Sequence, residues 1–254
     1  MTLHPAFLTQ PLAHRALHDK AAGRPENSRA AIRAAISAGY GIEIDLQPAA
    51  DGVAMVFHDY GLQRLTGETG PVKGRTAAEL SNIVLSGGDE GIPTLAEVLE
   101  LVGGRVPLLI EIKDQDGAMG PDVGPLETAA AELLRSYSGP LAVMSFNPHS
   151  IAAFSKAAPD ICVGLTTSAY DAQDWQLLPA ARRDALRLIP DFDALNAQFI
   201  SHEAKDLDSP RVAELKARNV PILCWTIRSL EAETQARRVA DNVTFEGYLS
   251  PLPA

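Results

Sequence analysis

The sequence predicts an α/β fold and, within that class, a closed (β/α)₈ barrel. Short apolar runs alternate with longer segments of helical periodicity along the whole chain, which is the pattern of a parallel sheet. The chain has 254 residues, and barrels of this type take roughly 200–250 residues as one domain. We therefore expect a single domain over residues 1–254, with an open doubly wound sheet as the alternative.

The first elements are a strand, a loop and a helix. Residues 12–15 form the short run of the first strand, which starts with apolar Leu12 and Ala13. The helix is expected over residues 28–38, because Asn27 or Ser28 supplies an N-cap and Gly39 a stop signal. This order is the start of a barrel repeat.

Two further strands are expected before the alternation pauses. Residues 41–46 alternate strictly between apolar and polar side chains, and an Asp51-Gly52 turn precedes an apolar run over 53–58. Residues 60–93 are rich in Gly, Thr and Pro and fit neither element type. They predict a small insertion that covers one end of the barrel.

The remaining elements resume the alternation to the end of the chain. We expect helices over 95–101, 126–135, 148–157, 174–187, 209–218 and 230–239, and strands over 106–113, 141–145, 161–166, near 194, over 220–227 and over 243–249. The chain lacks the glycine-rich patterns of dinucleotide and P-loop sites. Cys162 and Cys224 lie in apolar runs, which predicts reduced core thiols.

Charged side chains gather at the ends of two predicted strands. Glu43 and Asp45 share one face of their strand, about 6.6–7 Å apart, and Glu111 and Lys113 repeat this arrangement on another strand. Active sites of (β/α)₈ enzymes lie at the carboxyl ends of the strands. Three inward carboxylates repel one another unless a cation lies between them. An all-oxygen set suits Mg²⁺, Ca²⁺ or Mn²⁺, and a structural ion-pair network that includes Arg15 is the alternative.

Two histidines lie at the carboxyl ends of predicted strands. His14 follows the first strand and His58 ends the run over 53–58. An imidazole titrates close to neutral pH and is suited to giving or taking a proton. Arg15 offers a planar fork and Lys113 a point charge, which together suit a phosphoryl group. These residues predict acid–base chemistry on an anionic substrate.

The charge balance restricts the partners. The chain has 22 Lys and Arg against 32 Asp and Glu, a net charge of −10, which repels nucleic acid and anionic membranes. It shows neither a signal-peptide pattern nor 18 consecutive apolar residues. We expect a cytoplasmic protein with a small-molecule phosphodiester ligand, no nucleic-acid partner and no stable membrane association. The oligomeric state stays open.

An ordered set of short motifs resembles the glycerophosphodiester phosphodiesterase family along nearly the whole chain. Each motif alone is weak, but their order is specific: His14-Arg15, Pro25-Glu26-Asn27-Ser28, Glu43-Ile44-Asp45, Asp51-Gly52 through His58-Asp59, Arg64-Leu65-Thr66-Gly67, Glu111-Ile112-Lys113, Ser145-Phe146 and Trp225-Thr226.

The resemblance implies a barrel with a small insertion after the His-Asp segment and a metal-dependent hydrolase of glycerophosphodiesters. It would release sn-glycerol 3-phosphate and an alcohol. The resemblance further implies a divalent cation on Glu43, Asp45 and Glu111, His14 and His58 as general acid and base, Arg15 and Lys113 on the phosphate, and Trp225 beside the glycerol or alcohol part.

Three positions depart from the family pattern. Ala16 stands where glycine normally follows His-Arg, and a positive φ there would strain an alanine. Arg228 follows Trp-Thr-Ile where asparagine is common, and residues 242–251 lack the usual Gly-Ile-Thr-Asp-x-Pro ending. These changes spare the expected metal and proton-transfer residues and bear on the substrate pocket.

Two other functions are compatible with such a barrel. A phospholipase-type enzyme would need an exposed apolar or aromatic surface, and only 6% of the residues are aromatic. A non-catalytic barrel that binds a phosphorylated ligand would be expected to lack one of the histidines or carboxylates, and all of them are present.

Overall fold

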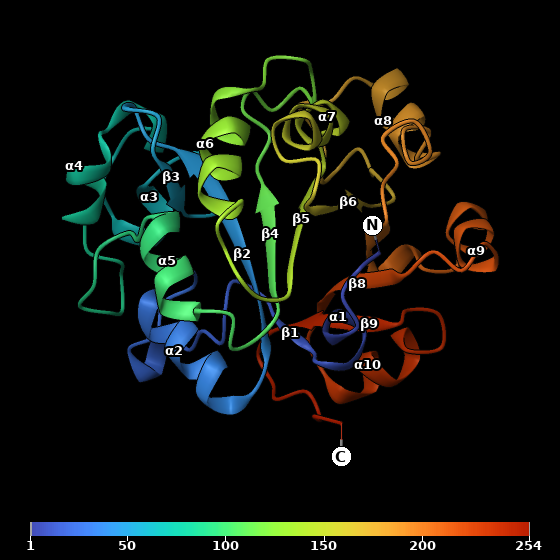
Figure 1. Ribbon diagram of the computed structural model, residues 1–254, viewed down its shortest axis with the longest axis horizontal. Helices are drawn as coiled ribbons and strands as arrows, with labels where there is room; N and C mark the ends of the chain where they lie inside the picture. The colour runs from blue at the N-terminus through green and yellow to red at the C-terminus, as the bar shows by residue number, and fades with distance from the viewer. Residues whose placement is uncertain (1, 254) are drawn as a thin grey trace.

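The computed structural model describes residues 2–253 and confirms the (β/α)₈ barrel (Figure 1). Within this range eight parallel strands pair in sequence, and the first pairs with both the second and the last, which closes the barrel. The strands are β1 (Leu12–Ala13), β2 (Gly41–Pro48), β4 (Leu108–Ile112), β5 (Leu141–Ser145), β6 (Cys162–Thr167), β7 (Phe199–Glu203), β8 (Ile222–Ile227) and β9 (Asn242–Phe245).

Helices follow the strands and cover the outside of the barrel (Figure 1). Their apolar faces pack against outward-facing strand residues such as Ile42, Ile110 and Val143. The covering helices are α2 (Arg29–Ala38), α5 (Leu95–Val102), α6 (Pro125–Leu134), α7 (Pro148–Ala157), α8 (Ala180–Arg187), α9 (Pro210–Ala217) and α10 (Leu230–Ala236).

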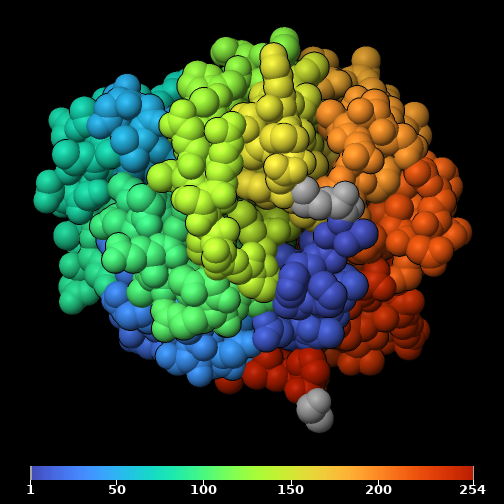
Figure 2. Space-filling view, in the orientation of Figure 1, coloured from blue at the N-terminus to red at the C-terminus, as the bar shows by residue number. Residues whose placement is uncertain are grey.

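The two ends of the barrel interior differ in chemistry. At the amino-terminal end, inward-facing Leu12, Leu109 and Phe199 form an apolar cluster. The short helix α1 (Ala6–Thr9) inserts Phe7 into this cluster, and Figure 2 shows the N-terminal segment in dark blue between the red and yellow-green parts of the surface. This end is therefore closed, and the polar inward residues lie toward the carboxyl ends of the strands.

The segment after β2 forms a small subdomain at one side of the barrel (Figure 1). Strand β3 (Ala54–Val56) runs antiparallel to β2 and leads into α3 (Gln63–Thr66), the 3₁₀ turn Val72–Gly74 and α4 (Ala77–Ser81). These elements share an apolar cluster of their own: Ala49, Met55, Phe57, Leu62, Leu65, Val72, Leu80, Leu85 and Ile92. The expected insertion over 60–93 lies here, and the run over 53–58 is a hairpin arm rather than a barrel strand.

The strand expected near residue 194 was placed wrongly. Residues 191–196 form turns, in which the Leu195 amide donates to the Asp191 carbonyl and Asn196 adopts φ 50°. The barrel strand is β7, in which the polar residues Ser201 and His202 are buried. They interrupt the alternation of apolar and polar residues from which a strand is predicted.

The helix expected over 174–187 is shorter than predicted. It begins only at Ala180, with Pro179 at its N-cap, so residues 174–179 form a loop that carries Trp175 toward the pocket. No helix within residues 2–253 combines the length and the apolar character that crossing a membrane requires.

Candidate active site

A cavity of about 730 Å³ opens at the carboxyl ends of the barrel strands. Seven of the eight residues expected to form the site line it: His14, Arg15, Glu43, His58, Glu111, Lys113 and Trp225. The eighth, Asp45, is fully buried beside them and pairs with Lys113. The structure therefore brings together residues from β1, β2, β4 and β8 and from the segment after β3.

The three carboxylates form a compact oxygen cluster. Glu43 and Asp45 project inward from β2, and Glu111 lies opposite Asp45 in the register of β4. One oxygen from each carboxylate lies within 4.8 Å of the others, and all three side chains are buried. Strand alternation puts Ile42, Ile44 and Leu46 on the outer face and Glu43 and Asp45 on the inner face, and the parallel pairing of β2 with β4 adds Glu111.

The charges in this cluster are unequally compensated. The Lys113 ammonium lies 2.6 Å from Glu111 and 2.9 Å from Asp45, whereas Glu43 accepts only the Arg15 backbone N–H, at 2.9 Å, and forms no ion pair among the described residues. Burial, together with Asp45 and Glu111, raises the pKa of Glu43 well above its usual value. Burial opposes ionisation of Asp45 too, but Lys113, His58 and Arg15 hold its pKa well below the usual value.

His14 is oriented by the carboxylate of Glu246, the residue that directly follows the last barrel strand, β9. Its Nδ1 lies 2.5 Å from Glu246 Oε2, and because an ionised carboxylate only accepts hydrogen bonds, Nδ1 carries the proton and Nε2 remains a proton acceptor. Burial lowers the pKa of His14 to about 4, against the opposing effect of Glu246. His14 is therefore neutral at pH 7. Glu246 also forms an ion pair with Arg228, at 2.7 Å.

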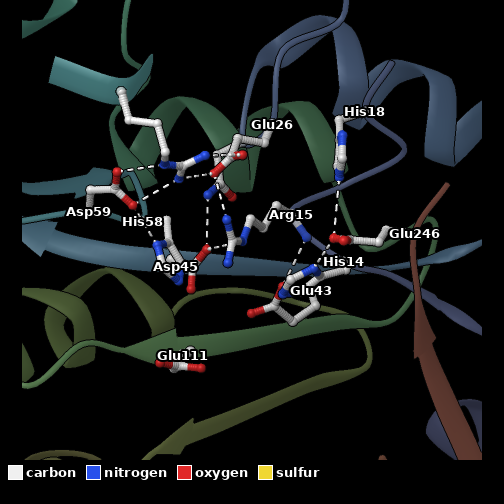
Figure 3. Close-up of polar contacts among 12 residues, drawn as sticks. His14, Arg15, His18, Glu26, Glu43, Asp45, His58, Asp59, Glu111 and Glu246 are labelled. Carbon is white, nitrogen blue, oxygen red and sulfur yellow. Dashed lines mark hydrogen bonds and ion pairs between the residues drawn. The ribbon is translucent and has the colours of Figure 1, made fainter. Parts of the chain in front are cut away.

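His58 belongs to a second chain of charged side chains, which runs through the insertion. Its Nδ1 lies 2.7 Å from Asp59 Oδ1. Arg64 on α3 donates two hydrogen bonds to Asp59 and two to Glu26, and Glu26 accepts from Arg15 at 2.8 Å. In the view of Figure 3, His58 and His14 lie at opposite ends of a row that contains Asp45 and Glu43.

The backbone beside His14 has the left-handed conformation that the family's glycine would suit. Ala16 has φ 65° and Arg15 φ 52°. The Ala16 amide bonds to the carbonyl groups of Ala13 and Glu43, so local hydrogen bonds keep this conformation despite the side chain. The alanine at position 16 is therefore accommodated in this conformation.

Several residues that support the site were not predicted as part of it. Glu246 directly follows β9, two positions beyond Thr244, which lines the cavity, and the alternation of apolar and polar residues over 243–246 was a signal for it. Glu26, Asp59 and Arg64 occur in the quoted motifs, but nothing in their spacing reveals that they meet. His18 also lies beside this carboxylate, 3.7 Å from Glu246.

The fold and the site define a (β/α)₈-barrel enzyme whose pocket combines a carboxylate cluster, two oriented histidines and two cations. Residues 14–243 match the model of the glycerophosphoryl diester phosphodiesterase family. The chain belongs to this family, which places it among the phosphoric diester hydrolases.

Individual relatives agree with this assignment. The chain is 32% identical over 176 residues to the glycerophosphodiester phosphodiesterase of Caldanaerobacter subterraneus, covering 65% of this chain and 70% of the relative. A phosphodiesterase from Oleispira antarctica, solved with the product sn-glycerol 3-phosphate, superposes with a TM-score of 0.77 at 25% identity over 95% of this chain and 94% of that one. The Thermotoga maritima glycerophosphodiester phosphodiesterase shares the fold, with a TM-score of 0.69 at 22% identity over 92% of both chains.

Proposed function

We propose that this protein hydrolyses glycerophosphodiesters to sn-glycerol 3-phosphate and an alcohol, using a divalent cation and acid–base catalysis by two histidines. The observation that carries this proposal is the convergence of Glu43, Asp45 and Glu111 within 4.8 Å, in one pocket with His14 and His58. The family assignment supports the same substrate class.

The carboxylate cluster fits a hard divalent cation. Its donors are all oxygen, as Mg²⁺, Ca²⁺ and Mn²⁺ prefer, and Glu43 has no counter-charge of its own among the described residues. Glu43, Asp45 and Glu111 would hold the ion. When bound, it would offset negative charge on the phosphoryl oxygens of the substrate.

Two cationic side chains next to the cluster are suited to the phosphate. Arg15 is held by Glu26, with its Nε 3.8 Å from Asp45, and Lys113 is held by Asp45 and Glu111. Fixed cations bind a phosphoryl group without reorganisation at the moment of reaction. Trp225 lines the same cavity and offers an apolar wall to the organic part of the substrate.

The two histidines differ in a way that suggests their roles. His14, neutral and bonded to Glu246 through Nδ1, is suited to take the proton of the nucleophile, which is water or the glycerol 2-hydroxyl. Glu246 then stabilises the imidazolium that forms. His58, bonded to Asp59 through Nδ1, would give a proton to the leaving alkoxide.

Glu246→Gln tests the orientation of His14. We expect about a 10–100-fold fall in kcat, the usual effect of removing a group that orients a catalytic ligand or base, with little change in KM. Glu246 raises the pKa of His14 against the effect of burial, so losing it should also move the acidic limb of the kcat/KM profile to lower pH. An unchanged profile and rate would exclude this role.

Metal binding should appear as a rise in melting temperature. A ligand at 100 times its Kd stabilises the folded state by about 2.7 kcal/mol, which for a chain of this size corresponds to about 5–10 °C. Differential scanning fluorimetry of chelator-treated protein with added Mg²⁺, Ca²⁺ or Mn²⁺ measures it. His58→Ala should retain the shift, and Glu43→Gln should lose it.

Product identity tests the proposed reaction. Phosphorus NMR of the purified protein with a panel of glycerophosphodiesters should show sn-glycerol 3-phosphate, with a transient cyclic glycerol phosphate if the 2-hydroxyl is the nucleophile. Free glycerol with a phosphorylated alcohol would contradict the proposed bond cleavage. Turnover of intact phospholipids alone would favour the phospholipase alternative, and no turnover of any diester would favour a binding protein.

A further inference from the structure

One corner of the active-site cavity is aromatic, and its residues come from strands and loops other than those that carry the carboxylate cluster. It is formed by Phe146 after β5, Trp175 before α8 and Trp225 on β8, and we call it the aromatic corner. The Phe146 ring lies 5.5 Å from Trp225 and 4.9 Å from Trp175 between centroids, in edge-to-face arrangements. The three side chains are half-buried, so part of each ring faces the cavity.

The aromatic corner carries a surplus of negative charge. Glu203 at the end of β7 and Asp174 beside Trp175 line the same cavity. The Lys205 ammonium lies 2.8 Å from Asp174, 3.0 Å from Glu203 and 3.4 Å from Asp171. Three carboxylates therefore share one ammonium, which leaves two negative charges at a rim whose ring faces are electron-rich.

A separate feature of the cavity favours a polar ligand. Thr244 on β9 lines it, is 1% exposed, and its hydroxyl has no hydrogen-bond partner among the described residues. A buried hydroxyl without a partner is unfavourable unless a ligand or water satisfies it. A hydroxyl group of the substrate would do so.

The chemistry of the aromatic corner selects among the possible alcohols. Ring faces attract an organic cation, and the attraction is strongest for alkylammonium groups that hold water weakly. Surplus carboxylates add to this attraction and repel an anionic head group. We propose that the aromatic corner binds the cationic head group of an aminoalcohol diester, such as glycerophosphocholine. This inference rests on the proposed function, because it assumes that the phosphate lies between Arg15 and Lys113.

Lys205 gives the proposal a distinctive consequence. Its ammonium forms ion pairs with the carboxylates that a substrate cation would also pair with, so the two cations compete for them. Removing the charge with Lys205→Gln should tighten binding of a cationic ligand, whereas most substitutions in a binding pocket weaken it. Lys216→Gln is the matched control, because Lys216 pairs with Asp241 beyond the amino-terminal end of β8, away from the cavity.

Intrinsic fluorescence reports on this corner directly, because the two tryptophans of the chain are Trp175 and Trp225. Choline chloride and its uncharged isostere 3,3-dimethylbutan-1-ol are titrated into the wild type and both variants. Choline should bind at least about tenfold more tightly than the isostere, and Lys205→Gln should strengthen choline binding roughly three- to thirtyfold. Lys216→Gln should leave it unchanged. Equal affinity for the two ligands, or no effect of Lys205→Gln, would overturn the proposal.

Turnover separates this inference from the proposed function. The wild type should favour glycerophosphocholine over glycerophosphoglycerol in kcat/KM, and Lys205→Gln should raise that ratio through KM. Hydrolysis of both diesters at equal kcat/KM, without choline binding, would overturn the head-group inference alone. Choline binding without hydrolysis of any diester would support the cation site and contradict the proposed function.

Discussion

Replacing His58 by alanine should lower kcat for glycerophosphodiester hydrolysis by about 10²–10⁴-fold, the usual contribution of a general acid. The leaving alkoxide of an aliphatic alcohol is a strong base and cannot depart without a proton. His58 is held by Asp59 at 2.7 Å in the candidate active site. Steady-state kinetics with glycerophosphocholine measures the loss, and far-ultraviolet circular dichroism verifies the fold.

The nature of the leaving group makes this prediction specific. A p-nitrophenyl diester of glycerol phosphate releases a weakly basic anion that needs no proton, so His58→Ala should lose far less activity on it. His14→Ala should lose activity on both substrates, because the nucleophile must be deprotonated in each. His149→Ala is the matched control, since this exposed histidine lies at the start of α7. Equal losses on both substrates would contradict the assignment of His58 as the acid.

Replacing Glu43 by glutamine should stabilise the metal-free protein by about 1–3 kcal/mol near neutral pH while abolishing activity. Burial and the neighbouring carboxylates raise the pKa of Glu43. As the pH rises through the usual glutamate range, the unfolded state loses this proton before the folded state does, so folding becomes less favourable. This free-energy cost of folding is absent at pH values below the pKa that Glu43 has in the unfolded chain, and it develops above that pKa. Glutamine at position 43 carries no charge and removes this cost, and its side-chain oxygen can still accept the hydrogen bond from the Arg15 backbone N–H.

Urea unfolding of chelator-treated protein measures this effect at two pH values. The variant and the wild type should be nearly equal near pH 4, and the variant should be more stable near pH 7. Added Mg²⁺, Ca²⁺ or Mn²⁺ should then stabilise the wild type but not the variant. Glu100→Gln is the control, because Glu100 is an exposed carboxylate on α5. A variant less stable than the wild type in chelator would show that Glu43 bears no electrostatic strain.

The barrel was predictable because its elements depend on local patterns. Strand alternation alone places Glu43 and Asp45 on the inner face, and parallel pairing puts Glu111 opposite Asp45. The strand predicted near residue 194 was misplaced because a search for alternating apolar residues does not find a strand with a buried histidine. The ring nitrogens of His202 form hydrogen bonds with Thr167 and Asp206. Buried polar pairs of this kind depend on tertiary contacts.

The supporting charges of the site could not be derived from spacing. Glu246 meets His14 across 232 positions of the chain because β9 pairs with β1 and closes the barrel. Arg64 reaches Glu26 only because the insertion packs back over the first loop. The closing of the barrel and the packing of the insertion bring together residues that lie far apart in the sequence. In the sequence, only the order of the motifs indicates that these residues belong to one site.

The central claim, a cation-dependent hydrolase with two catalytic histidines, is tested most directly by one assay. Chelator-stripped protein is incubated with glycerophosphocholine while Mg²⁺, Ca²⁺ or Mn²⁺ is added stepwise, and sn-glycerol 3-phosphate is measured. We expect release that starts from zero, saturates with added cation, and is absent in His14→Ala and Glu43→Ala. Full turnover in the presence of chelator, or turnover that survives both substitutions, would contradict the mechanism.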